Sequence, residues 1–108
     1  MKTKIRKPHK KHQSLLQTAT TEIVRLEGKH NYTSFVFFSG KQELMSYTLA
    51  MYTKILPENF IRVSKSCIIN KKYIKSVDGN EKKVVLTDKT ELRISRRRLN
   101  HVLQNFAA

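Results

Sequence analysis

The sequence predicts a mainly β domain with one short central helix and one C-terminal helix. Apolar and polar residues alternate with a period of two through residues 23–47 and again through 73–94, as is typical of half-buried strands. Helical spacing of apolar residues occurs only at residues 48–56 and 95–106. A chain of 108 residues has room for one domain with a single modest core.

The first half of the domain is expected to hold three strands followed by the central helix. The strands are expected at residues 23–26, 32–38 and 42–47, and the second of them is rich in β-branched and aromatic residues. Ser39-Gly40 is a suitable hairpin turn between the second and third strands. Thr48 then precedes the helical spacing as an expected N-cap, and Pro57 ends the helix.

The second half is expected to hold four strands and the last helix. The strands are expected at residues 60–63, 73–77, 82–86 and 91–94, with turns at Asp78-Gly79-Asn80 and Asp88-Lys89. Ser95 is a good N-cap for the final helix. The apolar residues of that helix fall on one face, and they are Leu99, Val102, Leu103 and Phe106.

The charge of the chain indicates a polyanionic partner. Lys and Arg number 22 against 8 Asp and Glu, which leaves a formal net charge of +14. Basic side chains release counterions when they approach a nucleic acid, so nucleic acid is the leading partner, ahead of an anionic membrane surface. Residues 1–14 are predicted to be a disordered basic arm, because residues 1–12 contain six basic residues and no acid. The expected folded domain is residues 15–108, and it remains basic without the arm.

Other classes of protein find little support in the sequence. No apolar run approaches the roughly 18 residues that span a bilayer, and the lone Cys67 excludes an intramolecular disulfide. We therefore expect a cytoplasmic protein in which Cys67 is a buried small hydrophobe. The four His residues have no carboxylate or Cys at ligand spacing, and no glycine-rich phosphate loop is present. We expect no enzyme, no metal and no cofactor.

Three clusters of basic and polar residues are the richest signal. They are residues 28–33 (GKHNYT), 62–66 (RVSKS) and 95–98 (SRRR), and each lies where a loop meets a regular element. Arg and Lys pair with phosphates or guanine edges, Asn matches adenine, and hydroxyl groups hold phosphate oxygens. The clusters therefore favour contact with nucleic acid.

Each cluster also has a plainer interpretation. Residues 96–98 could be the solvated face of a helix, and residues 30–31 could form only a hairpin loop. Arg62 could pair with a carboxylate such as Glu58 and fix a turn. The strand aromatics are expected in the core rather than on a base-stacking surface, and they are Phe35, Phe37 and Phe38. Charge alone does not separate these interpretations.

The order of the clusters resembles the LytTR family of bacterial DNA-binding domains. Residues 60–74 (FIRVSKSCIINKKYI) are similar to the family signature of Phe-x-Arg-x-His, a basic or polar residue, Ser, an apolar run, Asn and Ile. Residues 92–97 (LRISRR) resemble the strand that ends in Ser-Arg-Arg, and residues 27–32 (EGKHNY) resemble an upstream strand-loop-strand segment. The resemblance covers roughly residues 15–105. Ser64 departs from it, because the family usually has His at this position.

The resemblance implies an elongated fold of small antiparallel sheets in which loops enter successive major grooves. By position in the motifs, it implies base contacts from His30, Asn31, Thr33, Lys65 and Arg97. The residues that it implies for phosphate contact or support are Lys29, Tyr32, Arg62, Ser64, Ser66, Asn70, Ser95, Arg96 and Arg98.

Together these observations predict a sequence-specific, double-stranded DNA-binding transcriptional regulator with no catalytic step. We expect a monomer in solution and two copies on paired direct repeats, and we expect a stand-alone domain with no receiver domain before it. Two alternatives from other classes stay open. One is an RNA-binding or ribosome-associated basic β module, and the other is a protein-interaction role in which the fold is kept and DNA affinity is lost.

Deleting residues 1–12 should weaken binding to all DNA sequences alike. The arm has no base-reading pattern, so its contribution is expected to be contacts with phosphates. Each lost phosphate contact reduces the slope of log affinity against log salt by about 0.9, and titrations of the full chain and the deletion at several salt concentrations measure it. An unchanged slope would show that the arm does not contact DNA.

Overall fold

The structure is a computed structural model that describes residues 22–106, so the predicted basic arm lies outside the described residues. Eight strands form two antiparallel sheets. The five-stranded sheet has the order β3 (Gln42–Met45), β2 (Tyr32–Phe37), β1 (Ile23–Lys29), β5 (Cys67–Asn70) and β4 (Phe60–Ser64). The three-stranded sheet has the order β6 (Ile74–Asp78), β7 (Lys83–Leu86) and β8 (Glu91–Arg93).

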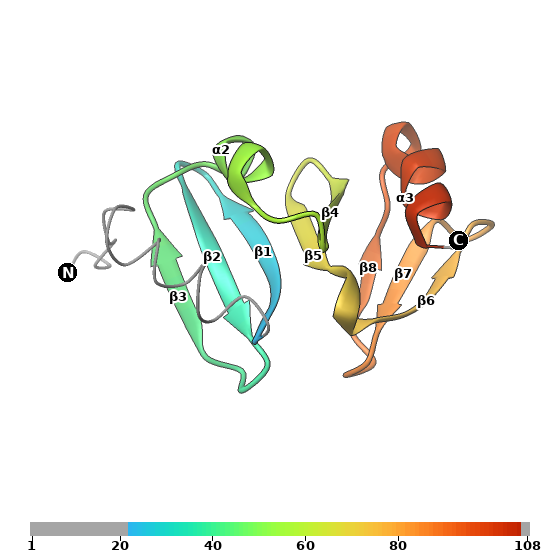
Figure 1. Cartoon of the computed structure of the whole chain (residues 1–108), viewed down its shortest axis with the longest axis horizontal. Helices are drawn as coiled ribbons and strands as arrows, with labels where there is room; N and C mark the ends of the chain where they lie inside the picture. The colour runs from blue at the N-terminus through green and yellow to red at the C-terminus, as the bar shows by residue number, and fades with distance from the viewer. Residues whose placement is uncertain (1–21, 107–108) are drawn as a thin grey trace.

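Short helical pieces join and cover the sheets. The α-helices are α2 (Leu49–Ile55) and α3 (Leu99–Phe106), and the 3₁₀ turns are η1 (Lys71–Tyr73) and η2 (Arg96–Arg98). The two sheets follow one another along the long axis of the molecule, with α2 above the first and α3 beside the second (Figure 1). The extents of 42 × 26 × 24 Å make the molecule elongated. The predicted mainly β class, the small antiparallel sheets and both helices are confirmed.

One strand, β5, was not predicted, because its sequence does not alternate. All of its residues, Cys67–Asn70, are buried. It pairs with β1 on one side and with β4 on the other, so it lies inside the five-stranded sheet. A strand that is covered on both faces is apolar throughout, and it then lacks the period of two by which half-buried strands are recognised.

β5 also separates two hydrophobic cores. Ile68 points into the core under α2, together with the fully buried Phe35 and Tyr52, whose rings meet edge to face at 5.0 Å. Its neighbours Cys67 and Ile69 point the other way, into the core that the second sheet and α3 complete. Burial and the charge of Glu27 raise the pKa of the Cys67 thiol to about 12, so the expectation of a buried, unreactive cysteine is confirmed.

Several local details differ from the predictions. Thr48 and Ser95 occupy N-cap positions in extended conformation, but neither side chain makes a capping hydrogen bond. The last helix begins with the 3₁₀ turn η2 rather than with an α-helical turn. Phe38, expected in the core, is 69% exposed, because it follows the end of β2 and stacks on the Tyr73 ring at 5.7 Å.

Asn70 holds the junction between the two sheets. Its side chain is fully buried, and its amide nitrogen donates to the backbone carbonyl of Ile23 at 3.0 Å. Its amide oxygen accepts from the backbone nitrogen of Lys72 at 3.1 Å and from the side chain of Asn59 at 3.2 Å. Asn70 therefore acts as a support residue, joining the start of β1 to the first turn of η1.

Replacing Asn70 by Ala should lower the free energy of unfolding by about 2–3 kcal/mol, because the buried carbonyl and amide groups that it serves would lose their partners. Urea denaturation followed by circular dichroism measures this loss. Asn80→Ala in the exposed β6–β7 turn is the matched control, expected to stay within about 0.5 kcal/mol. Equal stability of both variants would contradict the support role of Asn70.

Candidate nucleic-acid interface

The three basic and polar clusters lie along one edge of the molecule. The β1–β2 turn, the β4–β5 turn and the segment that follows β8 are all at the upper edge in Figure 1. Two backbone hydrogen bonds tie them together. Gly28 N donates to Ser66 O at 2.9 Å, which links the first two clusters, and Ser95 N donates to Val63 O at 2.8 Å, which links the last two.

The first cluster is a two-residue hairpin turn. Lys29 pairs with Tyr32, which leaves His30 and Asn31, both exposed, as the tip. His30 has a φ of 55°, in the left-handed region that a non-glycine residue adopts at a cost. The turn therefore projects an imidazole and an amide, two groups that donate and accept hydrogen bonds at base edges.

An ion-pair network supports this hairpin from within β1. The Glu27 carboxylate accepts a hydrogen bond from Arg25 Nε at 2.8 Å and lies 3.5 Å from Lys29 Nζ. Burial alone would raise the pKa of Glu27, but the hydrogen bond and charge of Arg25, together with Lys29, hold it below its ordinary value. Glu27 thus stays ionised and neutralises part of the positive charge at the base of the turn.

The second cluster is organised by Arg62 rather than by an acid. Arg62 Nε donates to the backbone oxygen of Ser64 at 3.1 Å, and Nη2 donates to that of Lys65 at 2.7 Å. Nη1 reaches Thr53 Oγ1 on α2 at 3.3 Å. No ion pair joins Arg62 to a carboxylate in the described part of the chain, so the suggested pairing with Glu58 is absent there. Arg62 fixes a turn, as that interpretation held, but it does so through backbone carbonyls.

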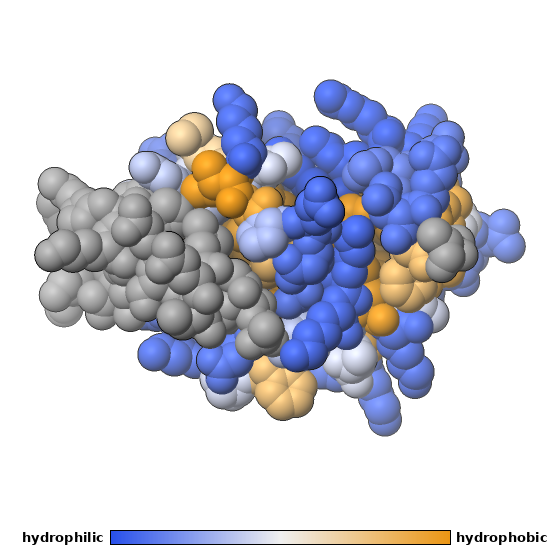
Figure 2. All heavy atoms as spheres, in the orientation of Figure 1, coloured by the Kyte–Doolittle hydropathy of each residue, from blue (hydrophilic) through white to orange (hydrophobic). Residues whose placement is uncertain are grey.

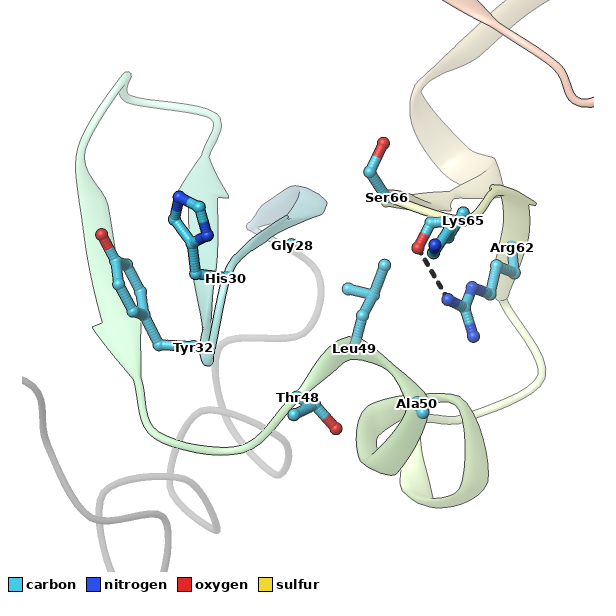
Figure 3. Close-up of a pocket in the computed structure, with 9 residues that line it drawn as sticks. All are labelled: Gly28, His30, Tyr32, Thr48, Leu49, Ala50, Arg62, Lys65 and Ser66. Carbon is cyan, nitrogen blue, oxygen red and sulfur yellow. Dashed lines mark hydrogen bonds between the residues drawn. The ribbon is translucent and has the colours of Figure 1, made fainter.

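A hollow of about 470 Å³ separates the first two clusters. His30 and Tyr32 stand on one side of it, Lys65 and Ser66 stand on the other, and Leu49 lies between them (Figure 3). The remaining lining residues are Gly28, Thr48, Ala50 and Arg62. The hollow thus has polar rims over a partly apolar floor, and the rims carry side chains from both clusters.

The third cluster lies close to the second. The η2 turn packs against β4, and burial, followed by the positive charges of Arg98 and Arg97, lowers the pKa of Arg62. A second hollow, of about 430 Å³, joins the two clusters. It is lined by Ser64, Lys65, Ser66, Cys67, Leu92, Arg93 and Ser95. Within residues 22–106 no ion pair neutralises Arg96, Arg97 or Arg98, so this end of the edge can accept an anion.

One predicted contact residue is not available on this edge. Thr33 is fully buried, and its hydroxyl donates to the backbone oxygen of Tyr47 at 2.8 Å. This burial contradicts the expected base contact, because the middle of β2, from Thr33 to Val36, is buried on both of its faces. Sequence reasoning also missed Thr53, which lies outside every motif; an exposed Thr on a helix carries no signal of its own.

Charge itself is not confined to this edge. Hydrophilic side chains project from both the upper and the lower side of the molecule in Figure 2. What distinguishes the upper edge is the side-chain chemistry of its turns. Among the described residues, no group of three His, Cys, Asp or Glu residues could hold a metal ion, and no helix there is long and apolar enough to cross a membrane.

The fold and this edge define a class: a small, elongated β domain with basic and polar turns along one edge (Figure 1). The family model of the LytTr DNA-binding domain matches residues 13–107. The chain therefore belongs to the LytTR family, whose members are DNA-binding domains of transcription regulators. The resemblance seen in the sequence is confirmed.

One solved structure has the same fold. It is a LytTr DNA-binding domain from Bacillus cereus, with a TM-score of 0.69 and a sequence identity of 20%. The match covers 78% of this chain and 80% of that chain. No curated protein matches the chain.

Proposed function

We propose that this protein is a sequence-specific, double-stranded DNA-binding transcriptional regulator that reads bases with turns inserted into successive major grooves. The observation that carries the proposal is the alignment of three basic and polar clusters on one edge, held together by the Gly28–Ser66 and Ser95–Val63 backbone hydrogen bonds. Such bonds keep the spacing of the clusters constant. Clusters at a constant spacing can contact the grooves of DNA, which repeat at a regular distance.

The dimensions of the molecule fit this mode of binding. Its longest extent of 42 Å is comparable to the roughly 34 Å helical repeat of B-DNA, so a molecule that lies along the duplex can face more than one groove. A major groove about 12 Å wide admits a two-stranded hairpin such as β1–β2. Two copies on direct repeats would each use the same edge, and neither copy would need a large apolar surface.

The proposed base contacts come from one residue or pair in each cluster. His30 and Asn31 read from the β1–β2 turn, Lys65 reads from the β4–β5 turn, and Arg97 reads from η2. Phosphate contacts are assigned to side chains beside them, and these are Lys29, Tyr32, Ser64, Ser66, Arg96 and Arg98. Ser95 is not among them, because its hydroxyl oxygen is buried. Arg62 and Asn70 are assigned to support, because their polar groups already bond within the protein.

The alternative of RNA binding receives less support from the strands. Phe35 is fully buried and Phe37 packs against the core under α2, so neither is free to stack on an unpaired base. A competition assay decides between the two partners. Duplex DNA, single-stranded DNA and structured RNA of equal length compete for the full chain at physiological salt, after selection of bound fragments from a random duplex library. The proposal fails if RNA wins or if selection enriches no sequence.

Replacing Arg97 by Ala should cost about 1–3 kcal/mol of binding free energy on the selected duplex and little on random DNA, because a base contact adds to specific binding only. Fluorescence anisotropy with both duplexes measures the two losses. Lys41→Ala is the matched control, since it removes one exposed positive charge from the β2–β3 turn at the opposite edge. An equal loss on both duplexes would make Arg97 a phosphate contact and contradict its assigned role.

A further inference from the structure

The guanidinium of Arg62 links three parts of the molecule. Its Nη2 bonds the backbone oxygen of Lys65 at 2.7 Å, and its Nε bonds that of Ser64 at 3.1 Å. Its Nη1 bonds Thr53 Oγ1 at 3.3 Å, and the same hydroxyl donates to the backbone oxygen of Leu49 at 3.0 Å. A continuous chain of hydrogen bonds therefore runs from the first residue of α2 to the tip of the β4–β5 turn.

This series of hydrogen bonds reaches the β4–β5 turn from the side that faces α2. In Figure 3 the Arg62 side chain lies between the α2 helix and the backbone of Lys65, with the dashed line marking the bond to Lys65. The Lys65 carbonyl that it holds belongs to the residue assigned to a base contact. The direction in which a side chain leaves the backbone follows the orientation of its peptide groups, so fixing this carbonyl restricts where the Lys65 ammonium group can reach.

We propose that Thr53 and Arg62 are positioning residues, through which helix α2 fixes the orientation of the Lys65 side chain toward DNA. The inference rests on the proposed function, because it names residues that act behind one of its base contacts. Neither residue needs to touch DNA in this role. In this role α2 contributes to DNA recognition, although it lies outside the three basic and polar clusters.

The geometry distinguishes positioning from a phosphate contact. Each of the three guanidinium nitrogens of Arg62 already has a protein acceptor, whereas a phosphate-binding arginine presents its fork to the ligand. Only a planar group with donors on three atoms reaches all of these oxygens at once. Lys in place of Arg62 keeps the charge but cannot make the same set of bonds.

The first test replaces Thr53 by Val, which keeps the shape of the side chain and removes the hydroxyl. We expect an affinity loss of about 3- to 10-fold on the selected duplex, the scale of one lost hydrogen bond, and little change on random DNA. Thr53→Ser keeps the hydroxyl and should retain wild-type affinity. Thr87→Val makes the same chemical change at an exposed Thr after β7, at the opposite edge, and should have no effect.

The second test asks whether Thr53 acts through Lys65. The Thr53→Val change is repeated in a Lys65→Ala background, in which the loss caused by Thr53→Val should disappear. A loss that persists there would overturn the inference, and so would wild-type affinity of Thr53→Val itself. Thermal unfolding of each variant is measured as well. Because Thr53 is exposed, the variants are expected to fold like the wild type.

The third test uses Arg62→Lys, which separates the two roles of that residue. A phosphate contact would survive this change, with a small loss shared by selected and random duplexes. A positioning role predicts a loss on the selected duplex only, together with relaxed preference at the base pair that Lys65 reads. If the wild-type chain itself shows no preference among duplexes, the proposed function fails. A preference that Arg62→Lys and Thr53→Val leave intact overturns only the positioning role.

Discussion

The rest of the structure depends on the burial of β5 on both faces. Ile68 fills the core under α2, while Cys67 and Ile69 fill the core shared with the second sheet. Each core therefore needs the same short strand in the same register, since a shift by one residue would exchange the two sets of side chains. The β4–β5 turn and Asn70 lie at the two ends of this strand. Its burial thus anchors the β4–β5 turn at one end and the junction to the second sheet at the other.

The burial of β5 on both faces also explains how much of this fold can be predicted from the sequence. Strands with one more exposed face, such as β4 and β7, alternate and are found by period alone. β5 has no solvated face, and its apolar run gives no period to detect. The candidate site likewise contains features that the sequence predicts and features that it does not. The sequence indicated that Arg62 could fix a turn, but it did not indicate the partners, because two of the three acceptors are backbone carbonyls, which the sequence does not encode. Thr33 sits inside a polar motif, yet the strand turns it inward.

The two edges of the molecule carry positive charge in different chemical forms. The β2–β3 turn, η1 and the β7–β8 turn lie at the lower side of the molecule in Figure 1, and they contain the exposed Lys41, Lys72 and Lys89, which add to the field that attracts a polyanion. The upper edge adds arginine, histidine and asparagine, whose planar groups match the edges of bases. In the proposed function, attraction and discrimination are therefore separate properties. Net charge over the whole surface is assigned to the first, and the geometry of one edge is assigned to the second.

The geometry of the upper edge includes one backbone conformation that lowers the stability of the folded protein. His30 holds a φ of 55° at the tip of the β1–β2 hairpin, where a left-handed residue other than glycine costs about 1–2 kcal/mol. Glycine would relieve this cost, but it would also remove the imidazole that the turn presents. The pairing of Lys29 with Tyr32 and the Gly28–Ser66 hydrogen bond maintain the turn against its strain. The conformation is thus held by neighbours on both sides of the hollow, which makes the β1–β2 turn dependent on the β4–β5 turn.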